Sequence, residues 1–170
     1  SALWEKIMAA GEPLGLRPGH TSTIRRVEGG MLSYHADMTA ENNPFELGLD
    51  RLVDLDMEAD FIGKAALRSI QQSGVKQRQV GLILNGAALS GPNTAYWPLR
   101  AGDQVVGRIT SAVYSPRLEQ NIALAMVADD YSVLGTQLEA DLSNEVREVT
   151  VVEKPFFDPK KAIAASTHSA

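Results

Sequence analysis

The chain has 170 residues, 44% of them hydrophobic, and a net charge of −5, which is ordinary for a folded protein of one domain or two small ones. A duplex-binding domain usually carries a basic face, so the acidic balance argues against nucleic acid as a main partner. There is no cysteine, which excludes disulfides, thiolate metal sites and thiol catalysis. No apolar run approaches the roughly 20 residues that span a bilayer, and no secretory signal is visible, so we expect no membrane partner and a cytoplasmic location.

The first part of the chain predicts two helices and two strands. Apolar residues near a helical period indicate a helix over residues 3–11. β-Branched residues favour a strand over 21–27, and alternating apolar and charged residues favour another over 46–55. Asp60 is expected to cap a helix over 61–72 that buries its apolar face.

From residue 76 onward, short β-rich runs are separated by glycines and prolines. These runs cover residues 79–84, 104–110, 122–127, 137–142 and 147–154. Short strands at this spacing are typical of a β-sandwich or a small closed barrel. We therefore predict an α+β chain in three parts: the end of a mixed α/β domain at 1–75, the β domain at 76–157, and a tail at 158–170.

The sequence contains no nucleophile-elbow, dinucleotide-binding or Walker motif. Of its three histidines, His20 and His35 lack the spacing of metal ligands, and His168 lies in the predicted tail. Without cysteines, a zinc site would need carboxylates at positions that no pattern supports. We therefore predict no metal site.

Arg26 and Glu28 are candidate binding residues, because residues two apart on a strand point to one face. In one interpretation they form a half-buried ion pair with each other that orients the turn at Gly29-Gly30. In the other, the Arg26 guanidinium receives a ligand carboxylate, which its planar fork matches in two-point geometry. Tyr34 also has two interpretations: it could be an aromatic residue of the core, or it could line the wall of a cleft.

The order and spacing of several segments resemble one family, the folate-dependent aminomethyltransferases typified by the glycine-cleavage T-protein. These segments are Arg26-Val27-Glu28-Gly29-Gly30, residues 33–38, residues 42–49, Asp60-Phe61-Ile62-Gly63-Lys64, Thr110-Ser111, Ser115-Pro116 and Lys154-Pro155-Phe156-Phe157. The resemblance implies an antiparallel β-barrel of the aminomethyltransferase C-terminal type at 76–157. It also implies tetrahydrofolate as the cofactor, with Arg26, Glu28 and Tyr34 beside the folate-type ligand.

Members of this family are roughly twice as long, so the chain is expected to be a C-terminal half. The carboxylate assigned to catalysis in the family lies upstream, and the resemblance therefore gives no catalytic residue here. Residues 21–23 replace the family's usual Ala-Arg-Asp, and His35 replaces the glycine that usually follows the tyrosine. We expect His35 at the surface or against Asp37. These departures resemble the dimethylsulfoniopropionate demethylase branch, which moves a methyl group from sulfur to tetrahydrofolate.

Three functions remain open. The chain could be the C-terminal part of a tetrahydrofolate-dependent one-carbon transferase, inactive alone. It could be a free-standing, non-catalytic module for ligand binding or assembly, or an independent enzyme whose chemistry the residues do not reveal. An apolar surface around Leu32, Tyr34 and Phe45 is expected to be covered either by the N-terminal half or by a second copy in a homo-oligomer.

Overall fold

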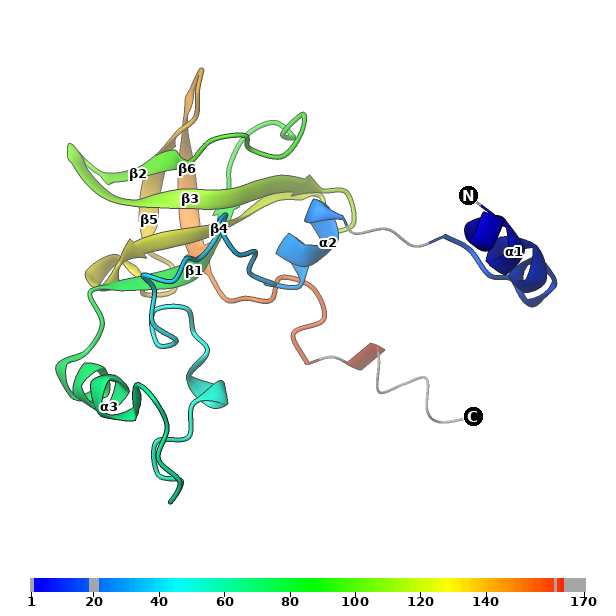
Figure 1. The fold of residues 1–170 in the computed structure, drawn as a ribbon. Helices are drawn as coiled ribbons and strands as arrows, with labels where there is room; N and C mark the ends of the chain where they lie inside the picture. Colours follow the sequence, from blue (N-terminus) through cyan, green and yellow to red (C-terminus); the bar gives the residue numbers. More distant parts are fainter. Residues whose placement is uncertain (1, 19–21, 161, 164–170) are drawn as a thin grey trace.

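The computed structural model describes residues 2–18, 22–160 and 162–163, and its centre is a closed barrel of antiparallel strands (Figure 1). The strands are β1 Gln77–Leu84, β2 Trp97–Ala101, β3 Gln104–Ser115, β4 Gln120–Ala128, β5 Gln137–Asp141 and β6 Val146–Val152. Around the barrel they follow the order β1-β4-β3-β2-β5-β6, with every neighbouring pair antiparallel. The prediction of an α+β chain that ends in a small antiparallel barrel is confirmed.

Aliphatic side chains from all six strands fill the barrel interior. Leu82, Leu99 and Ile109 are completely buried, and Val149 and Val151 nearly so. Burying one such side chain contributes on the order of 1.5–3 kcal/mol, so the barrel core is the main source of stability for this half of the chain.

The five strands predicted from residue 76 onward are all present, but the prediction missed β2. This strand carries Pro98, which lies opposite Arg108 of β3, and its pairing shifts register between Leu99 and Arg100. Proline cannot donate a ladder hydrogen bond, so its presence weakens a strand signal in the sequence. The barrel tolerates Pro98 in a short strand with a bulge.

The helices are α1 Ala2–Gly11, α2 Thr23–Glu28 and α3 Lys64–Ser73, with short 3-10 turns at Glu12–Leu14, Asp50–Leu52 and Asp129–Tyr131. The predicted N-terminal helix is confirmed. The predicted strand over 21–27 is wrong, because residues 23–27 form most of α2. Ile24 and Val27 pack there against Val113, Ile122 and Leu124 of the barrel. A helix this short depends on such tertiary contacts and not on intrinsic propensity.

The predicted helix over 61–72 is present as α3, but the predicted strand over 46–55 and the predicted Asp60 cap are wrong. Residues 46–55 form turns, including the 3-10 turn Asp50–Leu52, instead of a strand. The Gln79 N–H of β1 donates to the Glu46 carbonyl at 2.7 Å, but no ladder forms there. α3 begins at Lys64 after Gly63, whose φ of +93° favours glycine, and Asp60 does not cap it. The predicted apolar face is open, with Ile62 fully exposed, whereas the Lys64 ammonium is buried against two backbone carbonyls of the preceding loop.

The expected apolar surface is largely covered. Phe45 is buried, Leu32 packs against the cluster beneath α2, and of the three residues only Tyr34 is exposed. Exposed apolar side chains gather instead on α1, which lies away from the barrel in Figure 1. No helix formed by the described residues is long and apolar enough to cross a membrane.

Candidate functional site

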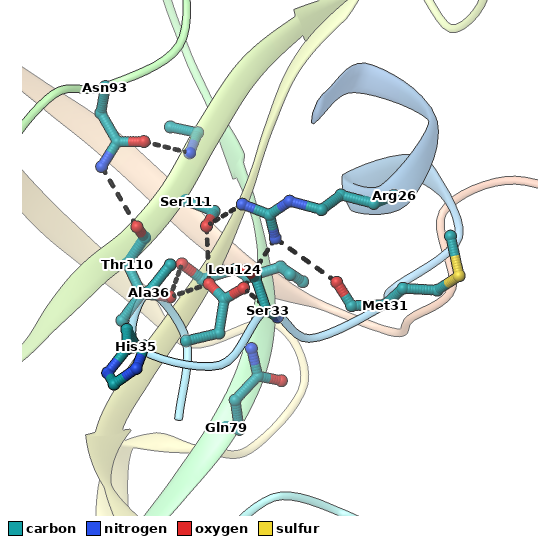
Figure 2. A network of polar contacts seen from close by, with 12 residues as sticks. Arg26, Met31, Ser33, His35, Ala36, Gln79, Asn93, Thr110, Ser111 and Leu124 are labelled. Atoms are coloured by element: carbon teal, nitrogen blue, oxygen red, sulfur yellow. Dashed lines mark hydrogen bonds and ion pairs between the residues drawn. The ribbon is translucent and has the colours of Figure 1, made fainter. Parts of the chain in front are cut away.

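Arg26 lies on α2 and reaches over β3 (Figure 2). Its Nη1 donates to Oδ2 of Asp37 at 2.7 Å and more weakly to the Met31 carbonyl at 3.4 Å. Its Nη2 donates to the Ser111 hydroxyl at 2.8 Å. The interpretation in which Arg26 pairs with Glu28 is therefore wrong, because a helix places the two side chains in different directions and Arg26 pairs with Asp37.

Asp37 is the centre of this network, and its side chain is completely buried. Oδ2 also accepts from the Ser33 backbone N–H at 2.9 Å. Oδ1 lies 2.6 Å from both the Thr110 and the Ser111 hydroxyls. A buried carboxylate needs such donors, since leaving it unpaired would cost several kcal/mol.

A bulge in β3 explains how two consecutive residues reach the same carboxylate. Neighbouring residues of a regular strand point to opposite faces. The pairing of β3 with β4 shifts register between Ile109 and Ser111, which turns Thr110 and Ser111 toward one side. The Asn93 side chain supports this irregular stretch, accepting from the Ala112 N–H at 2.7 Å and donating to the Thr110 carbonyl at 3.3 Å (Figure 2).

Glu28 lies at the end of α2 and is also buried. Its Oε1 accepts from the Ser115 hydroxyl at 2.6 Å, and its Oε2 lies 3.9 Å from Nη1 of Arg117. The Glu28 carbonyl accepts from the Phe157 N–H at 3.0 Å. Glu28 thus joins α2 to the end of β3 and to the segment that follows β6.

Tyr34 stands on a tight turn above the Asp37 network, and 53% of it is exposed. The turn is closed by the His35 N–H to the Met38 carbonyl and by the Asp37 N–H to the Ser33 carbonyl, each at 2.8 Å. His35 is exposed, as predicted, and adopts a φ of +71°. The interpretation of Tyr34 as a core aromatic is wrong: its ring faces solvent and touches only the edge of the His35 ring in aromatic contact.

A second polar pair, Lys154 and Gln79, lies beside the network and is partly buried. The Lys154 ammonium donates to Oε1 of Gln79, and the Gln79 Nε2 is buried without a hydrogen-bond partner among the described residues. Burial lowers the pKa of Lys154 to about 8, and the charge of Asp37 opposes that shift. In Figure 2, Gln79 lies beneath Ser33, next to the network but not bonded to it.

The arrangement is suited to binding a ligand. Among the described residues of the network, the buried Asp37 carboxylate is used to hold other protein groups in place. It offers an exposed aromatic ring and a partly exposed arginine side chain, each on a segment held by hydrogen bonds to Asp37. Sequence reasoning singled out Arg26, Glu28 and Tyr34 but missed Asp37, Thr110 and Ser111 as their anchors. In the described part of the chain, no group of three or more histidines or carboxylates could hold a metal ion; His20 and His168 lie outside it.

Comparisons with known proteins point to one family. Residues 77–158 match the glycine cleavage T-protein C-terminal barrel domain, and residues 1–57 match the GCVT N-terminal domain. An aminomethyltransferase from a Synechococcus species is 40% identical over 156 residues, covering 91% of this chain and 41% of that protein. The dimethylsulfoniopropionate demethylase DmdA of Ruegeria pomeroyi is 39% identical over 151 residues, covering 89% of this chain and 40% of the demethylase.

A solved structure gives the same picture of the fold. The glycine cleavage system aminomethyltransferase T of Bartonella henselae superimposes with a TM-score of 0.71 over 81% of this chain and 38% of that protein, at 23% identity. The chain thus spans about two fifths of the length of the relatives it matches. The barrel, the two matched domains and these relatives agree, and the chain belongs to the glycine cleavage T-protein family, with the C-terminal barrel domain of that family at residues 77–158.

Proposed function

We propose that this chain forms one wall of a tetrahydrofolate-binding channel in a folate-dependent one-carbon transferase. The observation that carries the proposal is the exposed Tyr34 ring on a turn that is held by Asp37, the carboxylate to which Arg26 is paired. An aromatic ring can pack against the ring systems of folate, and a guanidinium can receive one of its glutamate carboxylates. Tetrahydrofolate, when bound, supplies the nitrogen that accepts the one-carbon unit.

The three candidate residues have different roles in this proposal. Tyr34 contacts the ligand directly. The Arg26 side chain is 24% exposed, so part of its guanidinium can still meet a carboxylate while the rest holds Asp37. Glu28 is buried against Ser115, and it contributes to the site by fixing the end of α2.

The group transferred is an aminomethyl or a methyl group. Relatives named for each reaction match the chain at nearly the same identity. His35 in place of glycine favours the demethylase branch. Because the chain spans only about two fifths of these relatives, we propose that it does not turn over substrate alone. The absence of cysteine is in keeping with a reducing compartment, and we propose the cytoplasm.

A second candidate is a non-catalytic assembly module. It is favoured by α1, where Leu3, Trp4 and Ile7 are each more than half exposed. Surface of this kind tends to mark contact with another chain or with the rest of a larger fold.

Calorimetric titration of tetrahydrofolate into the chain, alone and supplied with the remaining part of the family fold, tests the first proposal. Arg26→Ala should weaken binding by about 1.5–3 kcal/mol, the range for a hydrogen bond to a charged group. Arg26→Lys should restore only part of that loss, since an ammonium cannot make the planar contact. Thermal melts of the same variants correct for the folded fraction. Equal affinities with a lowered melting temperature would leave Arg26 a purely structural residue.

A further inference from the structure

A groove of about 680 Å³ lies on the barrel surface, separate from the Arg26 network. It is lined by the start of β1, the first half of β3, the end of β4 and the residues leading into β2. Figure 1 places α2 toward the opposite end of β3 and β4. Sites for small molecules measure about 300–1,000 Å³, so the groove has the size of a ligand site.

The floor of the groove is apolar. Pro98, Val105 and Met126 contribute to it, and Val105 is more than half exposed. Gly107 lies between them and has no side chain to fill the hollow. A Cβ on Gly107 would come within 2.4 Å of the Met126 carbonyl oxygen, so this position keeps β3 close against β4.

One wall of the groove is a fixed aromatic–guanidinium stack. The Arg108 guanidinium lies 5.0 Å from the centre of the Tyr96 ring. The Tyr96 hydroxyl lies 2.9 Å from the His35 carbonyl and 3.0 Å from the Ala36 carbonyl, which fixes the ring in place. Groups that are already ordered lose little entropy when a ligand arrives.

The groove also carries more positive than negative charge, with two cations, Arg108 and Lys76, and one carboxylate, Glu46, in its lining. Neither Arg108 nor Lys76 forms an ion pair with another residue of the described ranges. Glu46 accepts from the side-chain amides of Asn42 and Gln77, which hold its carboxylate in place and leave its charge unchanged. Two cations that make no ion pair within the described ranges thus lie over an apolar floor, in a chain whose net charge is −5.

We infer that this groove binds a small planar aromatic carboxylate. The ring of the ligand packs on the apolar floor and against the Tyr96–Arg108 stack, and its carboxylate meets Arg108 and Lys76. This site does not depend on the proposed folate role, because Arg26, Glu28 and Tyr34 are not in its lining.

Two matched probes test the inference: 2-naphthoate and its neutral analogue 2-naphthamide, followed by amide chemical shifts in nuclear magnetic resonance. For ligands this small we expect saturable naphthoate binding with a Kd of about 0.1–1 mM. The largest shift changes should fall at Val105, Gly107 and Met126. The amide should bind about tenfold more weakly, because it lacks the charge that Arg108 and Lys76 recognise.

Variants then assign the charge recognition to this groove. Lys76→Gln should weaken naphthoate binding about fivefold and leave naphthamide binding unchanged, the loss being moderated by solvent at an open groove. Arg108→Gln removes a stacking partner as well as a charge, so it should weaken the binding of both probes, and that of naphthoate more. Arg108→Lys, which keeps the charge, should fall between Arg108→Gln and the wild type. The control is Arg25→Gln, which removes one exposed cation from α2 and should have no effect.

The inference is overturned by any of three results. Naphthoate could fail to saturate, the two probes could bind equally, or Arg25→Gln could weaken binding as much as Arg108→Gln. Shift changes centred on Tyr34 instead of Val105 would also overturn it, and would move the ligand to the surface proposed for folate.

Discussion

Asp37 and Arg26 form an ion pair of 2.7 Å that is closed by a shared partner, Ser111. The Ser111 hydroxyl accepts from Arg26 at 2.8 Å and donates to Asp37 at 2.6 Å. Three separate elements meet in this arrangement: α2, the turn that carries Tyr34, and the bulge of β3. The position of the exposed Tyr34 ring therefore depends on the buried Asp37 carboxylate.

Asp37→Asn should destabilise the protein by about 2–3 kcal/mol, because the variant loses the ion pair with Arg26. Its side-chain N–H₂ would also face hydrogen-bond donors that now bond to a carboxylate oxygen. The measurement is urea unfolding, with a lower midpoint and an unchanged slope. The matched control is Asp129→Asn, whose partner Arg78 lies at 2.8 Å with both side chains 41% exposed. An exposed pair contributes little, so the control should change stability by less than about 1 kcal/mol. Equal losses in the two variants would contradict the central place of Asp37.

Lys154 should make stability rise with pH. Its pKa is about 8 in the folded chain, against an ordinary value of 10.5. Between these pH values the unfolded chain holds a proton on Lys154 that the folded chain has released. The free energy of unfolding should therefore increase across this window, by up to about 3 kcal/mol for a fully expressed shift.

Lys154→Met should remove this rise while all other titrating groups stay in place. Unfolding free energies of both proteins at about pH 8 and about pH 10.5 give the difference directly. A wild-type slope identical to that of the variant would show that the lysine titrates normally when folded.

Gly107→Ala should destabilise the barrel by about 1–3 kcal/mol, the usual cost of overpacking. The new Cβ would lie 2.4 Å from the Met126 carbonyl oxygen and 2.8 Å from the Val127 Cα, both of them backbone atoms that cannot move aside freely. Gly91→Ala is the control, since a Cβ there meets nothing within 4 Å. Thermal melts that show no difference between the two variants would argue against tight β3–β4 contact at Gly107.

Self-association should depend on α1 and not on the surface around Phe45. Leu3 and Ile7 are exposed on α1, whereas Phe45 is buried. If the isolated chain forms oligomers, the double change Leu3→Glu and Ile7→Glu should give a monomer by light scattering across a wide concentration range. Leu52→Glu, at a 66% exposed position in another segment, should leave the mass unchanged. An unchanged mass in the α1 variant would place the contact elsewhere.

The barrel was largely predictable from sequence because its strands are short, β-rich and separated by glycine and proline. The exception, β2, carries Pro98 and is paired through a bulge, so its local signal is weak. The first part of the chain was less predictable. The β-branched residues before Arg26 favour a strand, but packing of Ile24 and Val27 on the barrel gives a helix.

The candidate site was predictable only in part for the same reason. Arg26 stood out because its side chain suits a carboxylate, and the carboxylate that it meets belongs to the protein itself. Asp37 lies 11 residues from Arg26, and Ser111 lies 85 residues away. Contacts between residues so far apart in the sequence depend on the fold, and no local sequence pattern predicts them. The bulge that turns both Thr110 and Ser111 toward Asp37 is likewise a property of the β3–β4 pairing.

The central claim is that the exposed Tyr34 ring lines a folate site, and its most direct test is the affinity for tetrahydrofolate of Tyr34→Ala beside Tyr34→Phe. The hydroxyl of Tyr34 makes no hydrogen bond within the described ranges, so Tyr34→Phe should bind as the wild type does. Tyr34→Ala should bind about three- to tenfold more weakly, the range for losing one aromatic contact, with an unchanged melting temperature. Calorimetry on the chain supplied with the remaining family fold gives both affinities. Equal affinity of Tyr34→Ala and the wild type would contradict the account.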